Sequence, residues 1–460
     1  MKSMHKSTLA TAVSLSTAVM VGQAHAAGFA LMEKDVTGLG QAFANLATGN
    51  GESSGLVGNP AAMTQIDGTA ISGGVNYIMP SFELQSGGTA TRVAPAALAG
   101  GISDPTGLGG DAGQSAGIPN LSIVHQLNDK ARVGMALTVP FGLATEYDDG
   151  WVGRYHGIES HVEVIELNPV LSFDVTPAWT VGGGLTIQYA EAKLTSAIDG
   201  GAVCAAGVAS GDITGPAAVA CGAYTPGTRA ADGHVEIEGD DWSVGYNLGV
   251  LWQPTEATRL GVSFRSGIDH DLEGDADYDM PVPLDAFPTF ADNPVRAGLD
   301  LPPSVGASLT HAFNDDLTAS LGLLWTGWSS FEELRVEQSG AGQSDIVTTE
   351  NWDDTLRVAI GGEWRFAPRW TLRAGTAYDP TPVPNSEFRT ARLPDADRIW
   401  ASVGLGYEIS KRWSVDVAYT HIWLNDSSAD STTESSIRNN LNGQYEGKVD
   451  ILGVQLNAHF

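Results

Sequence analysis

Two stretches of the chain match the Gly-x-Ser-x-Gly pattern that surrounds the nucleophilic serine of many hydrolases. They are residues 51–55, Gly-Glu-Ser-Ser-Gly, and residues 113–117, Gly-Gln-Ser-Ala-Gly. Such a serine acts from a sharp turn between a strand and a helix of an α/β sheet. Neither stretch has that setting, and loops rich in glycine and serine produce the motif by chance. We therefore expect no catalytic residue and no enzyme, with a hydrolase as the alternative.

A run of carboxylates between Asp269 and Asp279 offers the oxygen ligands that Ca²⁺ prefers. The run lacks the spacing of an EF-hand loop, including its closing bidentate glutamate. A solvated acidic loop is the simpler interpretation. Cys204 and Cys221 do not complete a zinc site, because structural zinc has four ligands and no histidines cluster with these thiols. We expect no metal centre and no cofactor.

The C-terminal segment 452–460 alternates strictly between apolar and polar residues and ends on an aromatic residue. Side chains alternate across a strand, so one face is apolar and the other polar. An exposed apolar edge of this length would aggregate in a soluble protein, whereas a membrane barrel has lipid outside and water inside. The apolar face holds Leu452, Val454, Leu456, Ala458 and Phe460, and the polar face holds Gly453, Gln455, Asn457 and His459.

The N-terminal end has the three parts of a secretory signal peptide. Lys2, His5 and Lys6 are basic, residues 9–21 are apolar, and residues 24–26, Ala-His-Ala, form a small-residue cleavage site. The apolar part is shorter than the ~20 residues of a spanning helix. We predict that residues 1–26 are removed after export. Because an exported protein meets an oxidising compartment, we expect a disulfide between Cys204 and Cys221.

Composition suits a barrel with a polar interior. The chain is 42% hydrophobic and 17% charged, with 56 glycines, and outside the signal peptide no apolar run is long enough for a membrane helix. The net charge of −30 excludes nucleic acid as a partner, because phosphates require a basic surface.

Alternating segments recur from about residue 69 to the end, and several have tryptophan or tyrosine at the margins of the apolar face, as membrane barrels do. We count about 14 segments, an even number of the kind these barrels have. A β-sandwich with buried aromatic faces is the alternative. Short turns are expected at 128–130, 176–178, 314–316 and 367–369, with long outer loops near 83–117, 196–234, 273–301 and 427–444.

Residues 27–66 show turn and short-helix patterns instead of alternation, notably 38–44, Gly-Leu-Gly-Gln-Ala-Phe-Ala, and 59–63, Asn-Pro-Ala-Ala-Met. Too few charges occur there for a solvated tail, so we interpret this segment as a plug, here called the hatch. The predicted organisation is a signal peptide (1–26), a hatch of short helices (27–66) and an all-β, 14-stranded antiparallel transmembrane barrel (67–460).

The order of several motifs resembles the FadL-type family of outer-membrane transporters across the whole mature chain. The motifs are Ala27-Gly28-Phe29, Gly38-Leu39-Gly40, Asn59-Pro60-Ala61, Gly142-Leu143-Ala144-Thr145-Glu146-Tyr147, Pro382-Val383-Pro384-Asn385 and Leu393-Pro394-Asp395-Ala396-Asp397-Arg398. The resemblance implies a monomer in the bacterial outer membrane that takes up hydrophobic molecules without ATP. Cargo would rest in apolar pockets and leave sideways into the bilayer.

The resemblance also implies roles for particular residues. Ala27, Gly28 and Phe29 of the hatch would reach the substrate pocket together with Phe141, and Lys193 would hold a carboxylate. A second cation expected of the family is absent from segments 195–198 and 347–350. Arg265, Arg335 and Arg357 are substitutes, unless they form ion pairs within the barrel.

The lateral exit is expected at Pro140, Phe141 and Gly142, in the third strand. Proline cannot donate to the ladder, and glycine allows backbone angles that a strand otherwise refuses. Met135, Leu137, Val139 and Phe141 are interpreted as a lipid-facing row leading to a bend. The alternative is that the strand ends at Pro140.

We expect passive uptake of hydrophobic molecules, with long-chain fatty acids as cargo. The alternatives are a channel for aromatic hydrocarbons or alkanes, an outer-membrane lipase, and an adhesion barrel. Expected partners are the cargo, outer-membrane lipids with lipopolysaccharide, and the barrel-assembly machinery, which would recognise the strand ending at Phe460.

Overall fold

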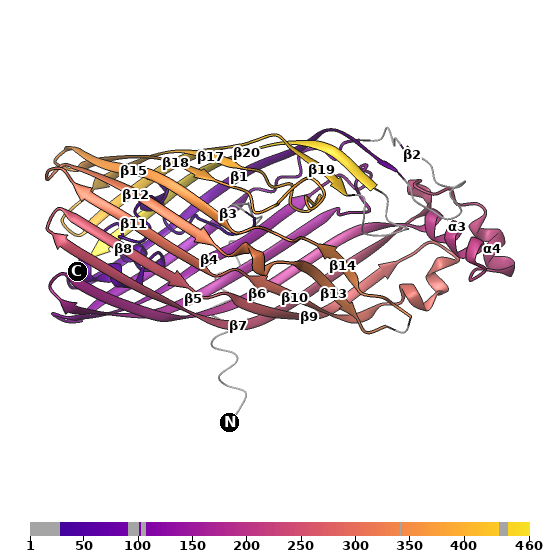
Figure 1. The fold of residues 1–460 in the computed structure, drawn as a ribbon, viewed down its shortest axis with the longest axis horizontal. Coiled ribbons are helices and arrows are strands. Elements are labelled where there is room, and N and C mark those ends of the chain that lie inside the picture. Colours follow the sequence, from indigo (N-terminus) through magenta and orange to yellow (C-terminus); the bar gives the residue numbers. More distant parts are fainter. Residues whose placement is uncertain (1–27, 91–100, 103–106, 341, 432–439) are drawn as a thin grey trace, which may run out of the picture.

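The computed structural model describes residues 28–90, 101–102, 107–340, 342–431 and 440–460. The expected signal peptide and Ala27 lie outside the described residues. The chain forms a closed, 14-stranded antiparallel barrel, as the alternation predicted (Figure 1). None of the helices in the described residues has the length and apolarity to span a membrane.

Strands pair with their neighbours in chain order, and the last strand pairs with the first. The first six barrel strands are β1 (Thr69–Ala90), β3 (Ala116–Asn128), β4 (Ala131–Glu146), β5 (Glu159–Thr176), β6 (Trp179–Asp199) and β7 (Asp232–Thr255). Two-residue β2 (Gly101–Ile102) pairs with the outer end of β1. β20 (Asn440–His459) closes the barrel on β1, from Ala70 opposite His459 to Ala90 opposite Asn440.

Several of the later barrel strands each consist of two shorter segments, because an irregular stretch separates the half near the short turns from the half near the long connections. These pairs are β8 (Thr258–Arg265) with β9 (Ile268–Asp279), β10 (Asn293–Leu301) with β11 (Ser304–Ala312), β12 (Leu317–Thr326) with β13 (Glu333–Gln338), β14 (Ile346–Thr349) with β15 (Thr355–Ala367), and β18 (Trp413–Leu424) with β19 (Ser427–Ser431). β16 (Trp370–Asp379) and β17 (Arg398–Glu408) are continuous.

The outer face of the wall carries an apolar band between two rows of aromatic residues. On β7, Trp242 and Trp252 are exposed at the two ends, with Val244, Tyr246, Leu248 and Val250 exposed between them. About ten residues at about 3.3 Å each, tilted by about 40°, span about 25 Å of height. This height matches the apolar band of an outer-membrane barrel.

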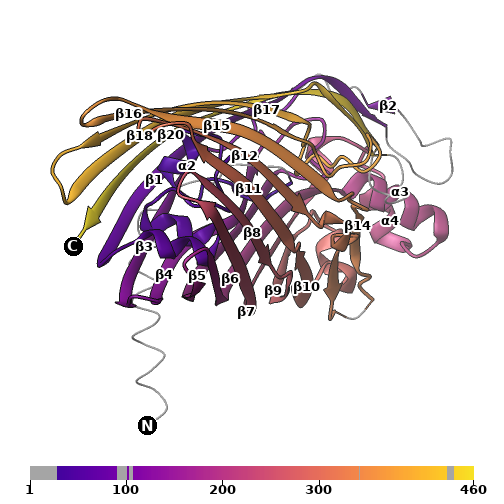
Figure 2. The same cartoon turned by 60° about the vertical axis from the view of Figure 1, so that its left-hand side comes forward.

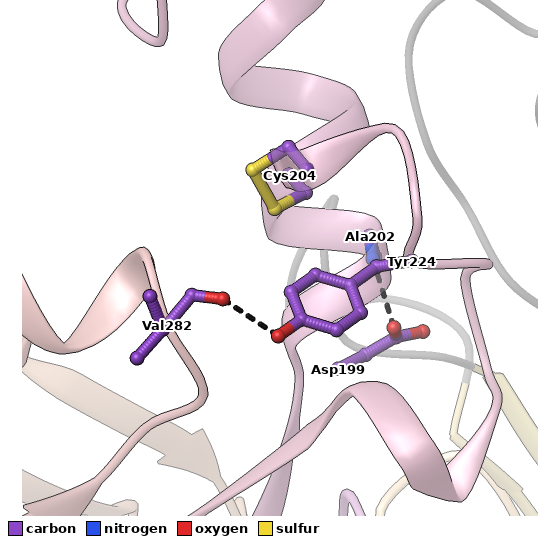
Figure 3. The surroundings of a disulfide bond; sticks show 6 residues. Asp199, Ala202, Cys204, Tyr224 and Val282 are labelled. Atoms are coloured by element: carbon purple, nitrogen blue, oxygen red, sulfur yellow. Dashed lines mark hydrogen bonds between the residues drawn. A yellow bond between two sulfur atoms is a disulfide. The ribbon is translucent and has the colours of Figure 1, made fainter. Parts of the chain in front are cut away.

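Short turns lie at one end of the barrel and long connections at the other, as expected. At the long end, α3 (Gly200–Ser210) and α4 (Gly215–Cys221) are joined by a disulfide between Cys204 and Cys221, whose Cα atoms are 5.2 Å apart (Figure 3). The Tyr224 hydroxyl donates to the Val282 carbonyl at 2.6 Å. That bond fastens the disulfide-linked loop to the connection between β9 and β10, which contains η6 (Leu284–Ala286) and η7 (Pro288–Phe290).

The acidic run is not a loop, which corrects the expectation for residues 273–301. Residues Ile268–Asp279 form β9, and Asn293–Leu301 form β10. In β9, the exposed carboxylates of Asp269, Asp271, Glu273, Asp275 and Asp277 alternate with Ile268, His270, Leu272 and Ala276, which are buried. Acidic residues favour loops, but here an apolar residue at every second position determines the strand.

The hatch consists of α2 (Val36–Leu39), η2 (Ser53–Val57) and η3 (Pro60–Gln65), and it lies within the barrel near the short turns (Figure 2). Strand glycines make room for it. A Cβ atom at Gly249 would lie 1.8 Å from Asn59 Oδ1, and one at Gly261 would lie 1.8 Å from the Ala47 carbonyl oxygen. Many glycines of the wall therefore serve close contact between the barrel backbone and the hatch.

Candidate substrate pocket and lateral opening

Phe29, at the start of the hatch, is enclosed by four aromatic side chains from the barrel. Its ring centroid lies 5.1 Å from Trp328, 5.6 Å from Phe331, 5.8 Å from Phe141 and 5.9 Å from Trp352. Trp328 belongs to η8 (Trp328–Ser330), which connects β12 to β13. These five residues are called the aromatic cage. Tilted and edge-on contacts of this kind stabilise aromatic pairs beyond their burial.

Gly28 fits the position beside the cage because it has no side chain. Its φ is +59°, and a Cβ atom there would lie 2.8 Å from both Trp328 and Trp352. Its amide donates to Asp395 Oδ2 at 3.0 Å, and Asp395 also pairs with the buried Arg398. The hatch is thus anchored at its beginning to the loop between β16 and β17.

A cavity lies beside Phe29, between the strands at the end of the barrel that has the long connections, and its ≈ 800 Å³ of empty space includes open solvent. Its walls are mostly apolar, with Glu238, Glu350 and Arg392 as the charged residues. The apolar lining includes Phe29, Leu143, Val162, Ala192, Leu194, Ile237, Leu272, Val295, Ala297, Leu299, Phe331, Leu334, Val336, Trp352 and Leu393.

The cation of this cavity, Arg392, was not identified from the sequence. Its Nη1 donates to the Glu159 carbonyl at 3.1 Å and to Ser160 Oγ at 2.9 Å, which holds the guanidinium beside the cavity. Glu350 accepts a hydrogen bond from Trp352 Nε1 at 2.9 Å. Arg392 lies in an irregular loop, directly before the Leu393-Pro394-Asp395 motif, so no strand periodicity indicates its direction.

Lys193 does not lie in this cavity, contrary to expectation. Its neighbours Ala192 and Leu194 line the cavity, so alternation turns Lys193 to the outer face of β6. There its ammonium group lies 2.9 Å from Glu236, 3.4 Å from Glu238 and 3.7 Å from Glu159.

The three other arginines considered from the sequence also have anionic partners outside the cavity lining. Arg265 contacts buried Glu166 at 2.5 Å, Arg335 contacts Glu333 and Asp345, and Arg357 lies 3.6 Å from Asp379. The alternative of ion pairs within the barrel therefore describes Arg265 and Arg357. Arg335 lies between the cavity residues Leu334 and Val336, so it points outward and forms its ion pairs on the outer face.

The wall has a gap beside β4. Pairing between β3 and β4 stops at Leu121 opposite Leu137, although β3 continues to pair with β1 as far as Ala116. On its other side, β4 shifts register against β5 between Thr138 and Phe141, and the strand then continues to Glu146. The strand does not end at Pro140, and its pairing is irregular at the place where Pro140 and Gly142 led us to expect a bend.

Hatch residues cover this gap with strand-like bonds. The Leu31 amide donates to the Pro140 carbonyl at 2.8 Å, and the Gly142 amide donates to the Phe29 carbonyl at 2.9 Å. Ala30 and Phe141 form an isolated antiparallel bridge between these bonds. The hatch therefore satisfies the Pro140 carbonyl and the Gly142 amide, two of the backbone groups of β4 that β3 leaves unpaired, as a membrane wall requires.

The register shift corrects the expected lipid-facing row. Met135 is exposed and Leu137 is partly exposed, but Val139 and Phe141 are buried. An irregular pairing interrupts the alternation, and it turns the Phe141 ring into the aromatic cage. Phe141 thus stays a candidate for cargo contact and does not face lipid.

The hatch motifs fix the segment to the wall. Asn59 Nδ2 donates to the carbonyls of Ala47 at 2.6 Å and Val250 at 3.2 Å, while its Oδ1 accepts from the Ala61 amide at 2.9 Å. Pro60 follows as the first residue of η3. Gly40 and Gly38 are both buried, and a Cβ at Gly40 would lie 3.0 Å from Gly404 Cα.

Glu33 is a further hatch residue that the sequence did not single out. It is 2% exposed, and neither carboxylate oxygen has a hydrogen-bond partner among the described residues. Burial raises the pKa of Glu33 to about 7, against the opposing charges of Arg398 and Arg357. The hatch thus carries an acid that titrates near neutral pH.

Comparison with known proteins supplies a family for this architecture. Residues 17–460 match the family described as outer membrane protein transport protein (OMPP1/FadL/TodX). A putative outer membrane protein of Neisseria meningitidis serogroup B is 30% identical over 482 residues, covering 98% of each chain. The long-chain fatty acid transport protein of Salmonella typhi is 29% identical, covering 90% of this chain and 91% of that one. A FadL homologue of Pseudomonas aeruginosa superposes with a TM-score of 0.80 at 26% identity, covering 94% of this chain and 100% of that one.

Proposed function

Because this chain belongs to the OMPP1/FadL/TodX family of outer membrane transport proteins, we propose that it takes up long-chain fatty acids and releases them sideways into the membrane. Family and fold make it an outer-membrane transporter of hydrophobic molecules. The observation that carries the finer proposal is the apolar cavity whose lining includes both Phe29 and the cation Arg392.

An acyl chain gains from entering this cavity because each buried CH₂ contributes about 0.8 kcal/mol. The carboxylate needs a different environment, since an unpaired charge is costly to bury. Arg392 supplies a guanidinium group that can bind a carboxylate through two parallel hydrogen bonds. Cargo would then lie with its carboxylate at Arg392 and its tail toward the aromatic cage.

Release requires movement of residues 29–31, because they close the gap beside β4. The backbone bonds from Leu31 to Pro140 and from Gly142 to Phe29 would break together, and Phe29 would leave the cage. The bilayer then accepts the apolar chain, which makes the process downhill without ATP. In this proposal the hatch is a gate that opens sideways rather than toward the periplasm.

The aromatic cage favours a second candidate cargo, the aromatic hydrocarbons. The rings of Trp328, Phe331 and Trp352 present both faces and edges to whatever replaces Phe29. A neutral hydrocarbon would make no use of Arg392. The two cargo classes therefore differ in whether uptake depends on this guanidinium.

Uptake of labelled oleate and of toluene, measured in a host lacking its own transporter, tests the proposal. We expect oleate uptake to require the protein and to fall at least about tenfold in Arg392→Gln, a loss of about 1.4 kcal/mol. Arg335→Gln, which removes an exposed guanidinium outside the cavity, is the matched control. If the unmodified protein takes up toluene but not oleate, the cargo is aromatic hydrocarbons and not fatty acids.

A further inference from the structure

One group of metal-ligating side chains lies apart from the substrate pocket. Among the residues that the structure describes, His161, Glu163 and Glu191 bring one ligand atom each within 4.8 Å of one another. His161 Nε2 and Glu163 Oε2 are 3.9 Å apart. Ligand atoms of one ion, each about 2.0–2.2 Å from it, lie at most about 4.4 Å apart, so a small rotation of these side chains toward one another would bring all three within reach of one ion.

Strand register explains why these three residues meet. Glu163 of β5 is directly opposite Glu191 of β6, and His161 precedes Glu163 by two residues on the same face. Val162 and Ala192, their alternating neighbours, line the cavity inside the barrel. The group therefore faces outward, and two of its members, His161 and Glu191, line a groove on the outer wall.

The level of the group relative to the membrane follows from two aromatic residues that lie closer to the membrane centre. Tyr189 and Trp242 are opposite each other on β6 and β7, with ring centroids 5.2 Å apart. Exposed aromatic residues mark the boundary between the apolar core and the headgroups. Glu191 lies two residues farther out than Tyr189, about 7 Å along the strand, and thus at the level of the lipid headgroups.

An independent feature of the register shows why a cation would stabilise this part of the wall. Carboxylates are directly opposed across three successive strand pairs, Glu163 with Glu191, Glu191 with Asp240, and Asp240 with Glu273. Like charges in direct opposition destabilise a sheet. At the β10 end of this row, Arg296 pairs with Glu273. The His161 group lies at the β5 end, where Lys193 is directed toward Glu236, Glu238 and Glu159 instead.

We propose that His161, Glu163 and Glu191 bind one divalent cation of the Zn²⁺ or Mn²⁺ class on the outer wall of the barrel. The imidazole nitrogen favours first-row transition ions over Mg²⁺ and Ca²⁺, which prefer oxygen ligands alone. Three protein ligands leave at least one coordination position for an outside ligand. Phosphate oxygens of outer-leaflet lipids are available at this height, so the ion would also join the wall to a headgroup.

Calorimetric titration of the purified, detergent-solubilised protein with ZnCl₂ and with MnCl₂ tests the site. We expect one site per chain, weakened at least about tenfold in His161→Gln, because even changes behind a ligand weaken metal affinity by about that factor. Glu191→Gln, which changes an exposed ligand, should also weaken binding. This variant tests the site if His161→Gln does not fold. Asp277→Asn removes a carboxylate from the same acidic face, outside the group, and should leave the affinity unchanged.

Two further measurements keep the assignment falsifiable. Binding should weaken as the pH is lowered, because a protonated imidazole cannot coordinate a metal. Three results would each overturn the proposal in favour of diffuse attraction to the acidic face. They are an unchanged affinity in His161→Gln, a loss of affinity in Asp277→Asn as large as that in His161→Gln, and binding of Ca²⁺ as tight as that of Zn²⁺. Oleate uptake reports separately on transport, since none of these residues closes the gap beside β4.

Discussion

The amide of Gly142 donates a hydrogen bond to the carbonyl of Phe29 at 2.9 Å, which joins the third barrel strand to the first residues of the hatch. The bond lies where β4 has lost its pairing with β3. One backbone contact therefore connects the place where β3 and β4 separate with Phe29, the central residue of the aromatic cage. In the proposed release, displacement of Phe29 and opening of the wall are thus linked.

Gly142→Arg should abolish lateral release while the barrel still forms. A long, charged side chain at the gap obstructs the passage and disfavours entry into lipid, and we expect oleate uptake to fall at least about tenfold, or about 1.4 kcal/mol of added barrier. Uptake in whole cells measures this. Gly298→Arg, a strand position with open space around it, is the control. Normal transport by folded Gly142→Arg would exclude this exit.

Phe29→Ala should weaken cargo binding and loosen the hatch. The substitution removes an apolar ring that is 4% exposed and in contact with four aromatic residues, and burial of such a side chain contributes about 1.5–3 kcal/mol. Oleate titration followed through fluorescence of Trp328 and Trp352 provides the affinity. Phe313→Ala, at an exposed residue near a short turn, should not alter it. An unchanged affinity in Phe29→Ala would separate this residue from the cargo site.

Hatch docking should weaken as pH rises from about 4.5 to about 7. Glu33 has an ordinary pKa of 4.5 when released and a pKa of about 7 when docked. Below pH 4.5 it is neutral in both states, and above pH 7 docking must bury its charge, at a cost of about 3 kcal/mol. Protection factors for amide hydrogen exchange at residues 29–34, which are corrected for the intrinsic dependence on pH, should thus fall across this interval.

Glu33→Gln should remove most of that fall in the protection factors and keep the hatch protected at pH 7.5. Asp67→Asn, an exposed acid just beyond the hatch, should retain the pH dependence of the unmodified protein. A pH profile that is the same with and without the Glu33 carboxyl would contradict the assignment.

The disulfide should stabilise the outer loop without being needed for the barrel. Cys204 and Cys221 are separated by 17 residues, and closing a loop of this size contributes about 3 kcal/mol in the chain-entropy model. The double variant Cys204→Ser/Cys221→Ser should insert normally but lose protection from proteolysis between residues 200 and 231. Mass spectrometry of the unreduced protein checks the bond itself, and two free thiols in exported material would refute it.

Alternation was sufficient to predict the barrel, because a period of two is repeated in every strand and the turns differ in length at the two ends. Alternation was not sufficient to orient single side chains, because a shift of one residue moves a side chain to the opposite face of the sheet. Lys193 lies between two cavity residues and therefore points outward. Phe141 follows an irregular pairing that reverses its face, and a carboxylate-rich strand was interpreted as a loop. Arg392 lies in an irregular loop, where no periodicity exists to orient it.

Three glycines of the barrel wall, Gly182, Gly249 and Gly261, restrict which substitutions the chain can accept during evolution. At each of these sites a single methyl group would collide with the hatch, so neither partner can enlarge by itself. Asn59 and the carbonyl of Val250 are 191 residues apart in the chain, yet they share one fitted contact. Substitutions in the hatch should therefore be accepted together with compensating substitutions in distant strands, and paired changes of this kind should trace the outline of the hatch on the inner wall.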